Sequence, residues 1–130
     1  MVEKKSATPA ASTKPLWQKM FIKGGIVALI GAPAGYEKLF AGGPAKVTTS
    51  GSGLADTVVL FAKDVHHLDA MLPTATGRLG PAATLWVAYQ KGGKELHRDT
   101  ARKIINEYGY EGVAMVAVDD VWSALRVKKV

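Results

Sequence analysis

Four apolar runs, each as long as a β-strand, constrain the fold of this chain more than any other feature. They span residues 26–30, 57–62, 84–89 and 113–118. A continuous apolar run of this length is typical of a strand that is buried on both of its faces. A shorter run at 45–49 adds one further candidate strand. We therefore expect a sheet whose central strands are covered on both sides.

The segment between the second and third long runs carries the signals of a helix. Residues 65–72 place apolar side chains on one side, Asp64 is a candidate N-cap, and Pro73 is expected to end the helix. The pair Gly80 and Pro81 then predicts a turn into the next strand.

A second helix is expected between the third and fourth long runs. Residues 100–108 repeat apolar side chains at helical spacing, with Asp99 or Thr100 as the cap and Gly109 as the end. Residues 122–128 follow the last run after a tight turn, and we interpret them as an antiparallel return strand.

The alternation of strands and helices predicts right-handed crossovers and a mostly parallel sheet with helices on both faces. The expected fold class is α/β: a compact three-layer Rossmann-like sandwich with a C-terminal antiparallel strand, which resembles a truncated methyltransferase fold. Residues 31–56 indicate the truncation, because they are too few for the two further strand and helix units usual at this point.

The composition excludes several classes of protein. The 130 residues are 48% hydrophobic and 22% charged, which is typical of a globular domain and not of a disordered or coiled-coil chain. Cysteine is absent, so disulfide bonds and thiolate chemistry are excluded. The longest apolar run is far shorter than the roughly 20 residues of a membrane helix, and no secretory signal is visible. We expect a cytoplasmic protein that does not enter a membrane.

The positive charge lies at the two ends of the sequence. Of the formal net charge of +6, residues 1–25 contribute +4 and residues 126–129 contribute +3, while residues 26–125 come to −1. Residues 1–14 are rich in Ala, Ser, Thr, Pro and Lys, which predicts a disordered basic tail before a single domain over 15–130. Charge on tails argues against a dedicated nucleic-acid site and leaves weak nucleic-acid binding through the basic termini as an alternative.

Four sequence motifs resemble a known bacterial family. They are KMFIKGG at 19–25, IGAPAGY at 30–36, LWVAYQK at 85–91 and VAVDDVWSALR at 116–126. The chain is similar over residues 19–127 to the small bacterial proteins catalogued as domain of unknown function 3052. This resemblance implies a compact α/β fold in the bacterial cytoplasm, and it supplies no established reaction and no catalytic residues.

The turn after the first long run is the first candidate site. Gly31 and Gly35 could let backbone N–H groups approach a ligand, and Tyr36 follows them. A dinucleotide or S-adenosylmethionine site would also need an acidic residue to bind ribose hydroxyls, but residues 38–55 contain none, and Pro33 removes one N–H donor. We interpret the glycines as a turn without a cofactor. A ligand here would be a small anion near Gly35 and Tyr36.

The loop after the third long run holds the second candidate site. Lys91, Lys94 and Arg98 follow a strand end, where open α/β sheets usually bind ligands. They could hold a phosphate, although the spacing of a Walker motif is missing, and the alternative is a solvated loop. Asp119 stands at another strand end, either as a ligand contact or as a residue that forms the turn or an ion pair.

The neighbouring residues His66 and His67 do not predict a metal site. Adjacent helical residues point about 100° apart, so the two rings do not converge on one ion. We interpret both as exposed, and the alternative is a weak adventitious site with Asp69.

These observations predict a non-catalytic, methyltransferase-like binding or scaffolding domain that pairs with an unidentified protein partner or forms a homodimer. The alternative is a small enzyme or sensor that binds a small molecule or anion at the carboxyl edge of the sheet through Lys91, Arg98 and Asp119. Both interpretations require the first three long strands to be parallel neighbours, so that residues 31–35 and 91–98 meet at one edge.

Overall fold

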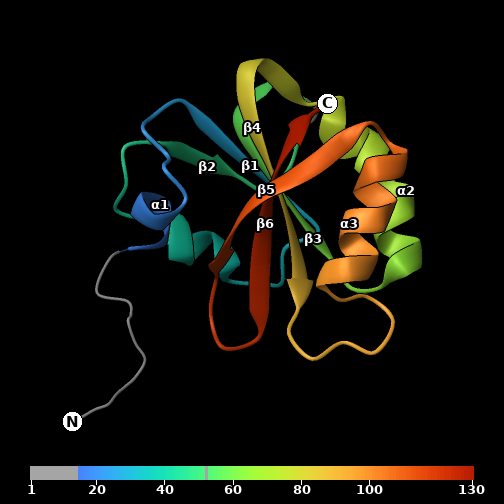
Figure 1. The fold of residues 1–130 in the computed structure, drawn as a ribbon. Coiled ribbons are helices and arrows are strands. Elements are labelled where there is room, and N and C mark those ends of the chain that lie inside the picture. Colours follow the sequence, from blue (N-terminus) through green and yellow to red (C-terminus); the bar gives the residue numbers. More distant parts are fainter. Residues whose placement is uncertain (1–14, 52) are drawn as a thin grey trace, which may run out of the picture.

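A six-stranded sheet forms the centre of the molecule, in the order β2-β1-β3-β4-β6-β5 (Figure 1). The computed structural model describes residues 15–51 and 53–130, and the expected tail over 1–14 lies outside the described residues. The strands are β1 (Ile26–Ile30), β2 (Lys46–Thr48), β3 (Ala55–Ala62), β4 (Leu79–Gln90), β5 (Tyr110–Ala117) and β6 (Trp122–Lys129). The first four strands are parallel, and β6 lies antiparallel between β4 and β5. This confirms the expected sheet.

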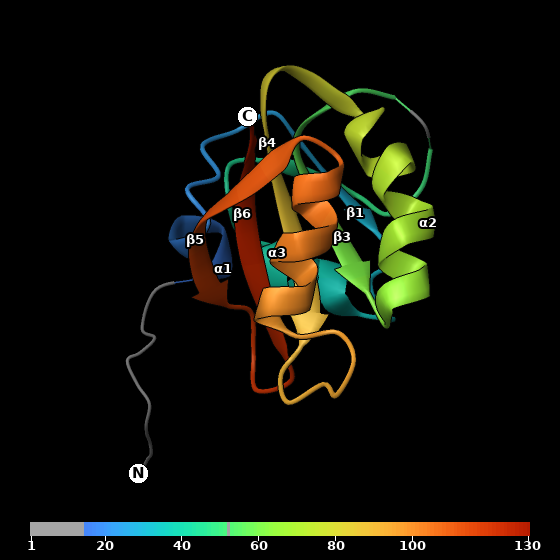
Figure 2. The ribbon, with the colours of Figure 1, turned by 45° about the vertical axis from the view of Figure 1, so that its right-hand side comes forward.

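Helices cover both faces of the sheet, which confirms the three-layer α/β fold. The helices α2 (Val65–Thr76) and α3 (Arg98–Glu107) lie together on one face (Figure 2). The short helix α1 (Leu16–Lys19) and the 3-10 helix η2 (Tyr36–Phe40) lie on the other face. None of the helices within 15–51 and 53–130 is long and apolar enough to span a membrane.

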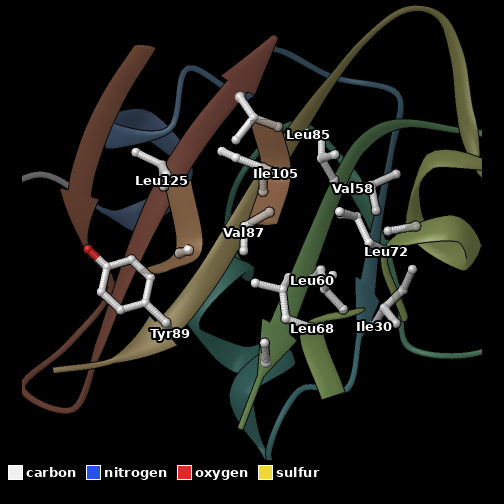
Figure 3. Close-up of a cluster of buried hydrophobic side chains, with 14 of the residues drawn as sticks. Ile30, Val58, Leu60, Leu68, Leu72, Leu85, Val87, Tyr89, Ile105 and Leu125 are labelled. Atoms are coloured by element: carbon white, nitrogen blue, oxygen red, sulfur yellow. The ribbon is translucent and has the colours of Figure 1, made fainter. Parts of the chain in front are cut away.

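Alternate residues of β3 explain why its sequence is apolar throughout. Val58 and Leu60 face the core beneath α2 and α3 (Figure 3), whereas Val59 and Phe61 face the core beneath α1 and η2. All four side chains are fully buried. Successive residues of a strand point to opposite faces, so a strand covered on both sides buries every one of them.

Helix α2 does not end where the sequence predicted. It continues past Pro73 to Thr76. Proline has no N–H to donate to the carbonyl of Asp69, one turn earlier. The single proton of the Tyr108 hydroxyl is shared between the Asp69 carboxylate, at 2.7 Å, and that carbonyl, at 3.1 Å. A residue at the end of the neighbouring helix therefore satisfies the acceptor that Pro73 leaves open, which explains why the proline is tolerated.

The expected turn at Gly80 and Pro81 is wrong as well. β4 begins at Leu79, so both residues lie inside the strand. The strand is irregular here, because Ala82 has a φ of +60° and the register of the pairing with β3 shifts nearby.

The start of α3 also differs from the expectation. The helix begins at Arg98, so His97 takes the N-cap position in place of Asp99 or Thr100. The Thr100 hydroxyl oxygen lies 3.0 Å from Nε2 of His97. The cap of α2 is confirmed, because Asp64 accepts a hydrogen bond from the backbone N–H of His67 at 2.8 Å.

The basic residues near the end of the sequence belong to the sheet and not to a tail. Arg126, Lys128 and Lys129 all lie on β6, which is flanked by β4 and β5. Their side chains are exposed, while Leu125 and Val127 are buried. The expected return strand over 122–128 is therefore confirmed, and the positive charge at this end lies on a strand.

Candidate functional site

The carboxyl ends of three parallel strands meet at one edge of the sheet. β1 and β4 flank β3, so the chain leaves Ile30, Ala62 and Gln90 on the same side of the molecule. This confirms that residues 31–35 and 91–98 start from a common edge. Open α/β sheets bind ligands at this edge.

A cavity of about 690 Å³ opens at this edge, which we call the carboxyl-edge cavity. The turn after β1 contributes Gly31, Ala32, Pro33, Ala34 and Tyr36 to its lining. The ends of the neighbouring strands and the start of α2 contribute Lys63, His67, Gln90 and Trp122. Its volume is within the range of about 300–1,000 Å³ that small-molecule sites occupy.

Gly31 turns the chain out of β1 in a space that only glycine fits. Its φ is +71°, in the left-handed region, and a Cβ there would lie 2.8 Å from the Phe61 carbonyl oxygen and 3.0 Å from Cε1 of His67. Gly35 also has a positive φ, +85°, but a Cβ there would meet no atom within 4 Å. Gly31 is therefore required by the close approach of Phe61 and His67, whereas Gly35 is favoured only by the positive φ of the turn.

Beside the carboxyl-edge cavity, a hydrogen bond joins the turn after β1 to the turn between β5 and β6. The Tyr36 hydroxyl donates to Oδ2 of Asp119 at 2.6 Å, and the other carboxylate oxygen accepts the backbone N–H groups of Val121 and Trp122, each at 2.8 Å. Below them, the ring of Phe61 makes edge contacts with Tyr36 and Trp122, with centroids 5.7 and 5.1 Å apart. Asp119 thus forms the turn between β5 and β6, the second of the roles that the sequence left open.

The surroundings of Asp119 and Tyr36 move their pKa values apart. Burial alone would raise the pKa of Asp119, but hydrogen bonds from Tyr36, Trp122 and Val121 and the positive charge of Lys91 outweigh it, so the pKa lies below the ordinary value of 3.8. The hydrogen bond to Asp119, followed by burial, raises the pKa of the Tyr36 hydroxyl. The carboxylate is therefore charged and the phenol protonated at neutral pH.

His67 and Lys63 line the carboxyl-edge cavity, although the sequence pointed to neither as a site residue. His66 is exposed as expected, but His67 is half-buried beside Gly31, and its Nδ1 accepts the backbone N–H of Lys63 at 3.1 Å. One signal was available: Asp64 as N-cap places His67 in the first turn of a helix, next to the carboxyl ends of the strands.

The residues predicted after β4 are only partly brought to this site. The backbone N–H of Lys91 donates to the carbonyl of Val121 at 2.7 Å, and its charge acts on Asp119. Lys94 is exposed in the loop, and Arg98 forms an exposed ion pair with Asp99 at 3.5 Å. Neither Lys94 nor Arg98 lines the carboxyl-edge cavity. Of the predicted residues, the structure therefore gathers Gly31, Tyr36, Asp119 and, through its charge, Lys91, with Gly35 in the same turn.

Several solved structures that are similar to this chain are methyltransferases. Ribosomal protein L11 methylase from Lactobacillus delbrueckii subsp. bulgaricus has a TM-score of 0.57 and 11% identity over 86% of this chain and 73% of its own. Magnesium protoporphyrin IX methyltransferase from Synechocystis PCC 6803, solved with bound SAM, has a TM-score of 0.55 and 14% identity over 87% and 74%. A Burkholderia thailandensis 1,6-didemethyltoxoflavin-N1-methyltransferase has a TM-score of 0.59 and 10% identity over 88% and 74%.

At these identities the likeness establishes the fold alone, which is a Rossmann-like methyltransferase fold. No family model matches the chain, and no curated protein matches it. The resemblance to the bacterial family of unknown function stays a prediction.

The side chains at the carboxyl edge do not fit S-adenosylmethionine well. Among the described residues, no carboxylate lines the cavity. Strand β2 ends at Thr48, whose hydroxyl donates to the Ser50 carbonyl at 2.9 Å, and Thr49 and Ser50 follow it with no acidic side chain. Ribose hydroxyls are usually bound by an acidic residue at such a position. Among residues 15–51 and 53–130, no three His, Cys, Asp or Glu side chains gather to hold a metal ion.

Proposed function

We propose that this chain is a non-catalytic protein of the methyltransferase-like fold that binds a small molecule in the carboxyl-edge cavity. The observation that carries the proposal is the cavity itself, about 690 Å³ at the strand ends, with Lys63, His67, Gln90 and Tyr36 on its walls. Polar side chains that stand beside small apolar residues in one cleft can both hold and orient a small molecule.

The absence of a ribose-binding carboxylate from the cavity lining supports binding without methyl transfer. Methyl transfer from S-adenosylmethionine requires that cofactor to be held in a fixed orientation beside the acceptor. Pro33 has no N–H to offer at the point where the turn approaches the cavity, which weakens such a site further. The chain thus has the fold of a methyltransferase, while the described lining of the cavity offers no acidic residue to hold the ribose of the cofactor, which supports the proposal.

Thermal-shift titration tests this proposal. We expect S-adenosylmethionine and S-adenosylhomocysteine to leave the melting temperature unchanged, and a panel of small polar metabolites to contain compounds that raise it saturably. Ala34→Trp should abolish the rise, because Ala34 lines the cavity and is exposed. Ala70→Trp, an exposed position on α2 outside the lining, is the matched control.

A saturable shift with S-adenosylmethionine that is lost in Ala34→Trp and kept in Ala70→Trp would contradict the proposal. So would a panel in which no compound shifts the wild-type protein.

Four statements remain predictions from the sequence. They are scaffolding of a protein partner, homodimer formation, a bacterial cytoplasmic location and the absence of nucleic-acid binding.

The strand β5 is the longer edge of the sheet and exposes Val113 and Met115, which makes it the edge on which a second copy would pair. Sedimentation velocity of the wild type and of Val113→Lys tests the homodimer.

A further inference from the structure

We propose that the ligand of the carboxyl-edge cavity is an anion, a small molecule with a phosphate or carboxylate group that Lys63 and His67 bind. This inference rests on the proposed function and names its ligand class. It follows from the hydrogen-bond donors and the charges at the cavity.

His67 presents a donor to the cavity. Its Nδ1 accepts the backbone N–H of Lys63 at 3.1 Å, so that nitrogen carries no proton. A neutral imidazole with an unprotonated Nδ1 carries its proton on Nε2, which can then only donate. The Nε2 edge lies beside Gly31, at 3.5 Å from the position that a Cβ of that glycine would take. The hydrogen bond from Lys63 thus fixes the tautomer, and the Nε2–H donor lies beside Gly31 in the lining of the carboxyl-edge cavity.

The charges at the cavity favour an anion. Lys63 lines it, and no ion pair involving Lys63 occurs in the described part of the chain. Two carboxylates lie close by, but neither belongs to the cavity lining: Asp64 accepts the N–H of His67, and Asp119 accepts three hydrogen bonds in the turn between β5 and β6. A cationic ligand such as a sulfonium would meet a lysine and a donor in the wall of the cavity, with the nearby carboxylates outside that wall.

The rest of the lining indicates what carries the anionic group. Ala32, Pro33 and Ala34 are small apolar residues, and Gln90 adds an amide that can both donate and accept. The small residues leave room for a compact ligand, and the Gln90 amide can hydrogen-bond hydroxyl groups that the ligand carries next to its anionic group. A sugar phosphate has this combination and a size that the cavity admits.

Isothermal titration with ribose 5-phosphate and ribose, a pair that differs in the phosphate alone, tests the inference. Inorganic phosphate and acetate serve as minimal anions. We expect ribose 5-phosphate to bind at least about tenfold more tightly than ribose, because hydrogen bonds to a charged group are worth about 1.5–3 kcal/mol, and 1.4 kcal/mol is tenfold.

Variants locate the binding. Lys63→Gln should weaken ribose 5-phosphate binding about tenfold, and Lys63→Arg should restore most of it. Lys94→Gln makes the same change of charge at the same edge but outside the cavity lining, and it should have no effect. His67→Phe keeps the ring and removes the Nε2–H donor, so it should weaken binding as well. Melting temperatures show that each variant is folded.

The outcomes separate this inference from the proposed function. Ribose that binds as tightly as ribose 5-phosphate, with both lost in Ala34→Trp, overturns the anion and leaves the proposed function in place. Equal losses in Lys63→Gln and Lys94→Gln, or no binding of any of the anions, overturn the inference too. If neutral compounds also fail to bind, the proposed function fails with it.

Discussion

In the turn after β1, Gly31 occupies a position that a larger residue would not fit. The change Gly31→Ala adds a Cβ 2.8 Å from the Phe61 carbonyl at a φ of +71°, so strain and overlap act together. We expect a loss of about 3 kcal/mol in the free energy of unfolding. Gly35→Ala, at a φ of +85° with no atom within 4 Å, should lose about 1 kcal/mol. Urea unfolding measures both, and equal losses would refute the close approach at Gly31.

The hydrogen bond between Tyr36 and Asp119 predicts that the free energy of unfolding depends on pH in the acid range. The pKa of Asp119 is lower in the folded chain than its ordinary 3.8, because hydrogen bonds from Tyr36 and two backbone N–H groups outweigh burial. A lowered folded pKa gives stabilisation that is fully present above the unfolded value and is lost as the pH falls through the folded one. The free energy of unfolding of the wild type should therefore exceed that of Asp119→Asn near neutral pH, and the difference should disappear as the pH falls below about 3.8.

Removing the phenol hydroxyl tests the cause of that shift. Tyr36→Phe removes one of the hydrogen bonds that lower the pKa of Asp119 against the effect of burial. The pKa of Asp119 should therefore rise, and acid unfolding should begin at a higher pH. Carbon-13 NMR of the Asp119 carboxyl group follows the pKa directly. Tyr110→Phe, in the opposite core, is the control and should leave the titration of Asp119 unchanged.

At the scale of elements, the Tyr108 hydroxyl at the end of α3 couples to α2 through the carbonyl and the carboxylate of Asp69, and Pro73 leaves that carbonyl open. Pro73→Ala restores an N–H that can reach the Asp69 carbonyl, which the Tyr108 hydroxyl now satisfies at 3.1 Å. We expect Pro73→Ala to stabilise the chain by about 1 kcal/mol. Tyr108→Phe should destabilise the wild type more than it destabilises Pro73→Ala. A double-mutant cycle by chemical unfolding measures the difference, and strict additivity would show that the two residues act independently.

The same pair shows why the sequence predicted the elements and misplaced their ends. Apolar periodicity reports burial, and burial sets which segments become strands and helices. Where an element ends depends on hydrogen bonds from distant residues, as Pro73 depends on Tyr108, 35 positions later in the sequence. Gly80 and Pro81 likewise sit inside β4 because β3 continues to pair beyond them, through Ala55 and Leu79.

At the scale of the whole molecule, the order of parallel strands was enough to predict the edge at which the cavity opens. The individual contacts at that edge were not predictable, since they join segments that the sequence separates widely. Tyr36 and Asp119 were both named as candidates from strand ends, but their hydrogen bond spans 83 positions. His67 was set aside because a pair of histidines on a helix does not suggest a ligand site, whereas its position depends on Gly31 of another element.

The charge of the molecule leads to a prediction about residues 1–14. These residues hold three Lys and one Glu, so deleting them removes a net +2 and leaves +4 on the remaining chain. The strands and the two buried clusters described above lie within 15–51 and 53–130. We expect the deletion variant to keep the melting temperature of the full chain and its ligand binding, and to elute earlier from a cation exchanger. A fall of several degrees would show that residues 1–14 contribute contacts to the domain.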